Sequence, residues 1–112
     1  MKFYHNPRCS KSRQTLNIVR EAGIEPEIVE YLKTPVSEEE LKEIVAKLDV
    51  PLTALIRKGE AVYKEKYKGK DLSDEEWIKA MVANPKMIER PIAVVGDKAV
   101  LGRPPENVSK LL

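Results

Sequence analysis

The first third of the chain predicts a strand, a helix and a second strand, and this unit constrains the fold most strongly. Residues 1–5 form a short apolar strand that stops before Pro7. Residues 10–22 carry apolar side chains at helical spacing, and Gly23 follows as a natural C-cap. Residues 26–31 predict the second strand. Strands joined in this way pair in parallel with a right-handed crossover, which favours an α/β fold.

The middle of the chain is predicted to be helical, and the end returns to strands. Ser37 to Glu40 and Ser73 to Glu76 each match the capping box that opens a helix. Residues 91–95 and 98–101 predict a hairpin around a Gly-Asp turn, and a last short helix is expected over 106–111. The whole order predicts an α/β fold with a small mixed sheet flanked by helices.

Composition bounds the partners and the compartment. The 112 residues suit one domain spanning 1–112, and a net charge of +2 is too small to indicate nucleic acid. No apolar run approaches the ~20 residues that a membrane helix needs, and no signal-peptide segment begins the chain. A single cysteine excludes an internal disulfide framework and a cysteine-rich zinc site. We therefore expect a cytoplasmic protein without a membrane partner.

Cys9, the single cysteine, lies at the predicted start of the first helix, among the cations of residues 5–13 (HNPRCSKSR). A thiol in such a setting has its pKa lowered from ~8.5 to roughly 3.5–7.5, and its thiolate is the nucleophile. Free backbone N–H groups and the helix dipole at the same point favour an anion. The alternative is a buried structural cysteine, but these polar neighbours do not form a core. The pattern predicts a reactive thiol that acts on an oxyanion.

The residues around Cys9 separate the possible thiol chemistries. A Cys-x-x-Cys redox pair is absent because position 12 is Ser12, and Thr15 stands where a low-molecular-weight phosphatase loop would have arginine. The only histidine is His5, so a cysteine protease would have no conventional triad. His5 is either a strand-end residue with a satisfied ring or a group that supports the thiolate or orients the loop. One Cys and one His are too few ligands for a metal site.

Three arginines are the next candidates, and each lies where a predicted element ends or begins: Arg57, Arg90 and Arg103. Arginine presents a planar fork of donors that can hold a tetrahedral oxyanion through two hydrogen bonds. The alternative for any one of them is a solvated surface charge. The sequence leaves open whether the three side chains converge.

Taken together, these segments resemble the glutaredoxin-coupled arsenate reductases of the thioredoxin-like superfamily. Residues 4–16 resemble the catalytic loop and first helix of that family. Its three arginine-bearing segments resemble residues 55–58, 90–92 and 101–106, and all four segments occur in the expected order. The resemblance implies a thioredoxin-like fold with a helical insertion over about residues 32–88, between the second and third strands.

The resemblance also implies a role for each residue of the predicted site. Cys9 is the nucleophile, and His5 is the histidine that supports its thiolate. The oxyanion is bound by three residues, Arg57, Arg90 and Arg103. Pro91 is the superfamily's cis-proline facing the active-site loop, and Ser12 is a structural residue of that loop.

The implied activity is reduction of arsenate to arsenite. The reaction takes two electrons, and this chain supplies one thiol, so an external thiol and reductant are required. By the resemblance these are glutathione, as co-substrate, and glutaredoxin, with no bound cofactor and a monomeric protein. Two alternatives share the fold: a glutathione-dependent thiol oxidoreductase and a thiol-based regulatory binding protein. A third is a family member without arsenate activity.

Overall fold

The computed structural model describes residues 1–112 and contains a four-stranded mixed sheet with strand order β2-β1-β3-β4. The strands are β1 (Lys2–Tyr4), β2 (Glu27–Val29), β3 (Ile92–Val95) and β4 (Lys98–Leu101). β1 pairs in parallel with β2 and antiparallel with β3, and β3 and β4 form the terminal hairpin. The predicted strand–helix–strand unit, the hairpin and the small mixed sheet are therefore confirmed.

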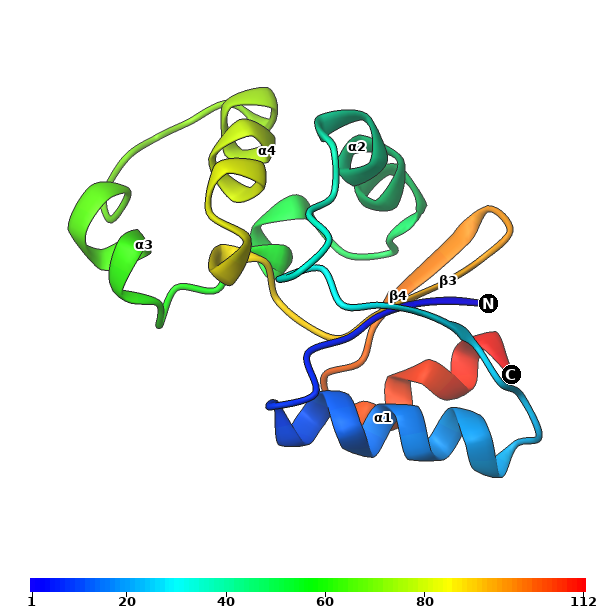
Figure 1. Cartoon of the computed structure of the whole chain (residues 1–112). Helices are drawn as coiled ribbons and strands as arrows, with labels where there is room; N and C mark the ends of the chain where they lie inside the picture. The colour runs from blue at the N-terminus through cyan, green and yellow to red at the C-terminus, as the bar shows by residue number, and fades with distance from the viewer.

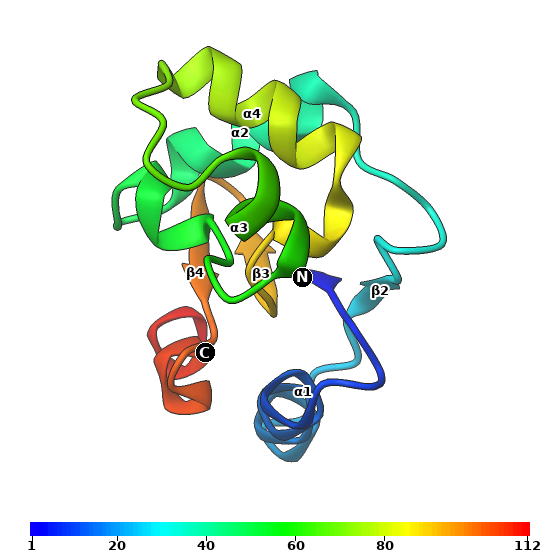
Figure 2. The ribbon, with the colours of Figure 1, turned by 90° about the vertical axis from the view of Figure 1, so that its left-hand side faces the viewer.

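Helices cover both faces of this sheet (Figures 1 and 2). One face carries α1 (Ser10–Glu21) and the C-terminal 3-10 helix η3 (Pro105–Leu111), which lie side by side. The other side carries the helices between β2 and β3, which are α2 (Glu38–Lys47), η1 (Leu52–Leu55), α3 (Ala61–Lys66), α4 (Asp74–Ala83) and η2 (Pro85–Met87), with α3 standing away from the sheet in Figure 1. None of these helices is both long enough and apolar enough to cross a membrane.

Each face of the sheet has its own apolar core. Below α1 the core is small, and its fully or almost fully buried members are Phe3, Leu16, Val19, Ala93 and Val108. Under α2 and α4 the core is larger, with 15 buried residues that include Leu41 and Met81. Burying one such side chain contributes about 1.5–3 kcal/mol, so the larger core dominates the stability of the fold. Cys9 lies in the junction between the carboxyl end of β1, an interior strand of the sheet, and the start of α1.

The two predicted capping boxes have different outcomes. At the start of α4 both halves form, since Ser73 Oγ accepts from Glu76 N at 3.2 Å and Glu76 Oε1 accepts from Ser73 N at 3.1 Å. At the start of α2 only Ser37 caps the helix, so the predicted full box is wrong there. The carboxylate of Glu40 accepts a hydrogen bond from the Tyr4 hydroxyl of β1 instead. The Tyr4 hydroxyl on the sheet thus takes the place of the Ser37 backbone N–H as the partner of Glu40.

Candidate active site

Cys9 is the N-cap residue of α1, with an extended backbone (φ −93°, ψ 123°). Its side chain lies near the free N–H groups of the helix start, although it makes no capping hydrogen bond of the kind that a side-chain oxygen normally makes there. Burial would raise the pKa of the Cys9 thiol, but the backbone N–H groups of Ser12 and Lys11 and the Arg90 guanidinium outweigh it and lower the pKa below its ordinary value. The fold therefore favours the thiolate, which is the reactive form.

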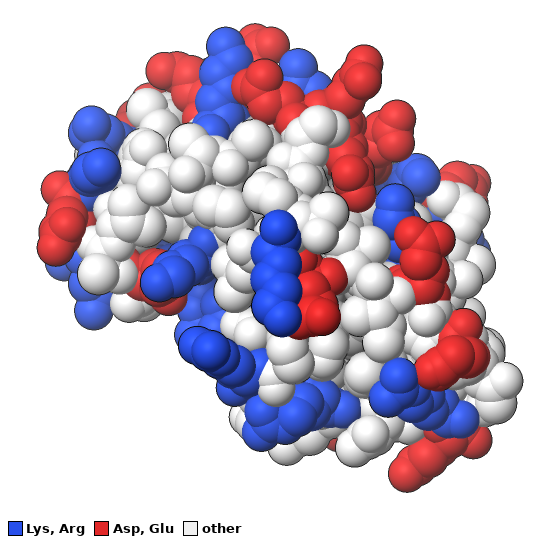
Figure 3. All heavy atoms as spheres, in the orientation of Figure 1, with Lys and Arg blue, Asp and Glu red and all other residues white.

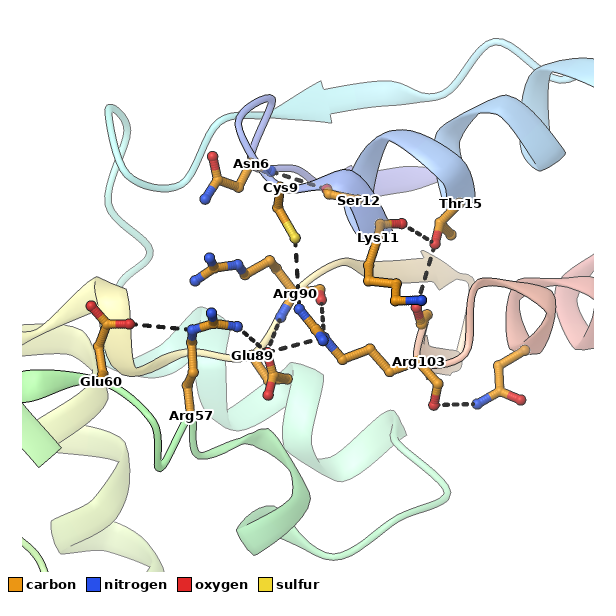
Figure 4. Close-up of polar contacts among 12 residues, drawn as sticks. Asn6, Cys9, Lys11, Ser12, Thr15, Arg57, Glu60, Glu89, Arg90 and Arg103 are labelled. Atoms are coloured by element: carbon orange, nitrogen blue, oxygen red, sulfur yellow. Dashed lines mark hydrogen bonds and ion pairs between the residues drawn. The ribbon is translucent and has the colours of Figure 1, made fainter. Parts of the chain in front are cut away.

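The structure brings the three predicted arginines to one side of Cys9 (Figure 4). Arg103 makes the direct contact, since its Nη2 donates to Cys9 Sγ at 3.6 Å. The Nε of Arg103 donates to the carbonyl of Arg90 at 2.7 Å, which holds the two residues together. Arg57 joins the group through a shared carboxylate rather than through the thiol. The question that the sequence left open is answered by this convergence.

That shared carboxylate belongs to Glu89, which sequence reasoning missed. Glu89 Oε1 accepts from Arg57 Nη1 at 3.0 Å and lies 3.1 Å from Arg103 Nε. Burial would lower the pKa of Arg57, but Glu89 and Glu60 outweigh it and raise that pKa. The only sequence signal for Glu89 was its position directly before Arg90. In this site a carboxylate therefore occupies guanidinium donors of Arg57 and Arg103.

His5 is buried and contacts the hydroxyl of Ser12, with 2.7 Å between His5 Nδ1 and Ser12 Oγ. The same oxygen accepts from the backbone N–H of Asn6 at 3.1 Å. Burial lowers the pKa of His5, and the negative charge of Glu30, which would raise this pKa, has a smaller effect. The ring therefore favours its neutral form. No hydrogen bond joins His5 to Cys9. Of the two functional roles considered for His5, the geometry favours orienting the loop through Ser12.

Gly102 lies where the end of β4, which leads to Arg103, packs against Pro91 and Thr15 of α1. The Arg90–Pro91 peptide bond is cis, and Gly102 N donates to the carbonyl of Pro91 at 2.9 Å. A Cβ atom on Gly102 would lie 2.8 Å from Pro91 Cγ and 2.8 Å from Thr15 Oγ1. Only glycine therefore lets the end of β4 pack this closely against Pro91 and α1. The sequence offered no specific signal for this packing.

Two buried donors at the site have no hydrogen-bond partner: the hydroxyl of Tyr31 and Nε of Arg90. The side chain of Tyr31 is 2% exposed and lies beside Arg90. Burial raises the pKa of Tyr31 more than the neighbouring guanidiniums lower it, so its hydroxyl keeps its proton. Buried polar groups almost always have partners, and an anion would supply an acceptor to both. Sequence reasoning missed Tyr31 because its ring matches an ordinary core residue.

The surface around the site is basic. Figure 3 shows Lys and Arg atoms gathered around the indentation between the start of α1 and the helical region, whereas both signs mix over the rest of that view. No group of three or more His, Cys, Asp or Glu side chains is placed to hold a metal ion. A nucleophilic sulfur, converging guanidiniums and unfilled donors can together bind a small tetrahedral oxyanion and attack its central atom.

Comparison with known proteins agrees with this geometry. The ArsC family model matches residues 4–111, and the chain belongs to the ArsC family. It is 43% identical to a protein of Haemophilus influenzae named arsenate reductase, over 98% of this chain and 97% of that protein. It is 48% identical to the uncharacterized protein YfgD of Escherichia coli, over 100% of this chain and 96% of that protein.

A solved structure shows the same fold. The structure titled arsenate reductase from Vibrio cholerae superposes with a TM-score of 0.94 at 45% sequence identity, covering 100% of this chain and 98% of that one. The four-stranded mixed sheet flanked by helices matches that structure, and the predicted thioredoxin-like fold is confirmed.

Proposed function

We propose that this protein is an arsenate reductase in which the Cys9 thiolate attacks arsenate held by Arg57, Arg90 and Arg103. The observation that carries the proposal is the contact between Arg103 Nη2 and Cys9 Sγ, at 3.6 Å, beside the unpartnered Nε of Arg90. A guanidinium at this position can bind an oxygen of the anion while the sulfur reaches the central atom. The relatives named arsenate reductase support the same substrate.

The first step forms a bond between Cys9 Sγ and arsenic(V). The thiolate supplies the electron pair, one As–O bond breaks, and that oxygen leaves as water after it takes up a proton from solvent. The arginines neutralise the anion and the charge that grows on its oxygens, and preorganised donors of this kind lower the barrier most when charge develops. This substitution does not change the oxidation state of arsenic, so the adduct still contains arsenic(V).

The second step supplies the electrons from outside the chain. Reduction of arsenic(V) to arsenic(III) takes two electrons, which two thiols provide by forming a disulfide, and Cys9 is the only thiol here. Glutathione attacks the sulfur of the adduct, arsenite leaves with the bonding electron pair, and a Cys9–glutathione disulfide remains. Glutaredoxin then restores Cys9 by thiol exchange. The cycle uses no bound cofactor or metal, runs in a monomer, and belongs in a reducing cytoplasm.

The test is arsenate-dependent oxidation of NADPH, coupled through glutathione, glutathione reductase and glutaredoxin, for the wild type and Cys9→Ser. We expect turnover that requires arsenate and glutaredoxin and that Cys9→Ser abolishes. Circular dichroism and urea unfolding of the variant serve as the control for folding, since the thiol makes few structural contacts.

Turnover that survives in Cys9→Ser would remove Cys9 from the mechanism. A folded wild type without turnover, whose Cys9 is still alkylated readily, would replace arsenate reduction with the thiol oxidoreductase alternative. Protein disulfides mixed with glutathione would then be the substrates to assay.

A further inference from the structure

Glu89 places a carboxylate inside a site built for an anion. We propose that Glu89 is a specificity residue: it accepts a hydrogen bond from an O–H of the bound oxyanion and selects oxyanions that carry a hydrogen over those that carry none. Arsenate and phosphate belong to the first class near neutral pH, and sulfate belongs to the second. The inference deepens the proposed function, on which it rests for the presence of an oxyanion.

The geometry brings Glu89 to the anion through Arg103. One guanidinium contacts both groups, because Nη2 of Arg103 donates to Cys9 Sγ at 3.6 Å and Nε lies 3.1 Å from Glu89 Oε1. In Figure 4 the Glu89 carboxylate points toward the guanidinium ends of Arg57 and Arg103, below the sulfur. An oxyanion that binds Arg103 and touches the sulfur would therefore lie on the same guanidinium that contacts the carboxylate.

The carboxylate is held firmly enough to discriminate. Its side chain is only 17% exposed, and Arg57 Nη1 donates to its Oε1 at 3.0 Å while Arg103 Nε lies 3.1 Å away. A carboxylate accepts hydrogen bonds and donates none. An oxygen that carries a hydrogen can donate to it, whereas a bare oxygen is repelled by it.

The charge balance of the site strengthens this effect. Three guanidiniums are opposed by the Cys9 thiolate and by two carboxylates, Glu89 and Glu60, which both pair with Arg57. Within this paired group, positive and negative charges are equal in number, so the group itself has no excess positive charge with which to offset contact between two anions. Hydrogen-bond complementarity therefore decides which oxyanion binds.

The remaining donors complete the pattern. Nε of Arg90 and the hydroxyl of Tyr31 are buried without partners, so they are free to donate to bare oxygens of the ligand. A hydrogen-carrying oxyanion needs several donors and one acceptor, and among these residues Glu89 is the acceptor. A site that hydrogen-bonds a ligand O–H can reject the analogue that lacks it by large factors.

The rival interpretation is that Glu89 only clamps Arg57 and Arg103 together. The two interpretations differ in Glu89→Gln, which keeps the shape of the side chain and can donate as well as accept. Loss of a clamp would weaken the binding of phosphate and sulfate alike. Loss of a specificity residue would instead strengthen the binding of sulfate relative to that of phosphate.

The experiment measures protection of Cys9 from alkylation by iodoacetamide, a neutral reagent, in increasing phosphate or sulfate at constant ionic strength and slightly alkaline pH. For the wild type we expect half-protection at a phosphate concentration at least about tenfold below that of sulfate. In Glu89→Gln the ratio should fall to within about threefold of unity, chiefly through tighter sulfate binding. The matched control is Glu75→Gln, which removes an exposed carboxylate that pairs with Lys42 outside the site and should keep the wild-type ratio.

Equal protection by the two anions in the wild type, a ratio unchanged in Glu89→Gln, or no protection by either anion would each overturn the inference. Neither anion is reduced, so the result is independent of arsenate turnover. A protein that selects phosphate over sulfate but never reduces arsenate would contradict the proposed function and leave the role of Glu89 intact.

Discussion

The two sides of the candidate site are built in different ways. The thiol side, residues 5–12, is held by local contacts: His5 to Ser12 spans seven positions, Asn6 to Ser12 six, and Arg8 to Asn6 two. The arginine side, Arg57, Glu89, Arg90 and Arg103, is held by contacts across 32 positions between Arg57 and Glu89 and 13 between Arg103 and Arg90. The thiol side is therefore encoded by a short sequence motif, whereas the arginine side is assembled only when distant segments of the chain fold together.

The two sides also differ in how completely their polar groups are paired. On the thiol side the buried His5 ring and the Asn6 N–H both meet the hydroxyl of Ser12. On the arginine side Nε of Arg90 has no partner, and Glu89 takes donors that an anion would use. The loop that carries Cys9 is thus already held by its own hydrogen bonds, whereas the arginine side keeps a buried donor that the proposed ligand would pair.

The sharpest way to separate the two sides is Arg90→Ala. We expect arsenate turnover to fall by about 100-fold, because the variant loses a donor to the developing charge. Arg90 also lowers the pKa of Cys9, so its removal should shift the pH midpoint of Cys9 alkylation upward, toward that of an ordinary thiol. Steady-state kinetics and alkylation rates measured across pH check both effects.

The matched control for that experiment is Arg20→Ala, on the exposed far end of α1, where Arg20 pairs with Glu25 at 2.9 Å. An exposed pair contributes at most about 1 kcal/mol, so turnover and the alkylation midpoint should stay at wild-type values. If Arg90→Ala resembled this control, Arg90 would not belong to the site.

The thiol side is tested by Ser12→Ala, for which we expect a loss of about 2–3 kcal/mol in the free energy of unfolding. The change removes the hydroxyl that meets His5 Nδ1 and Asn6 N and leaves both buried groups unpaired. Urea unfolding provides the measurement, with Ser109→Ala as the control at an exposed serine. Equal stability of the two variants would show that the hydroxyl does not hold the loop.

The close packing of Gly102 against Pro91 and Thr15 is tested by Gly102→Ala. A methyl group there meets the ring of Pro91 and the side chain of Thr15 at under 3.0 Å, so these groups must move apart. We expect a cost of about 1–2 kcal/mol in the free energy of unfolding, measured by urea denaturation. The matched control is Gly59→Ala, because a Cβ at Gly59 meets no atom within 4 Å. A free energy of unfolding equal to that of the control would mean that Gly102 is packed less tightly than these contacts indicate.

Local patterns predicted the parts of the molecule that depend on neighbouring residues. Gly23 ends α1 with a φ of +86°, and the box at Ser73 forms completely. Cys9 lies at the helix start as its neighbours indicated. In each case the determining contact lies within a few positions of the residue, so the sequence contains both partners side by side.

Long-range pairing explains what the sequence did not reveal. Glu89 and Tyr31 enter the site through the approach of segments far apart in the chain, and neither has a local signal beyond the proximity of Glu89 to Arg90. The wrong prediction at Glu40 has the same origin, because its carboxylate found Tyr4 on the neighbouring strand instead of the nearby backbone. Pairings of this kind depend on the finished topology.

The bond from Tyr4 to Glu40 links the beginning of α2 to the central strand of the sheet. Lys2, on the same strand, adds an ion pair with 3.6 Å between its Nζ and Glu40 Oε2. The first turn of α2 is therefore stabilised by atoms that reach their positions only when β1 is in place. Fraying of this turn and displacement of β1 become coupled events, so exchange of the Glu40 amide hydrogen, which donates to Ser37 Oγ, reports on both.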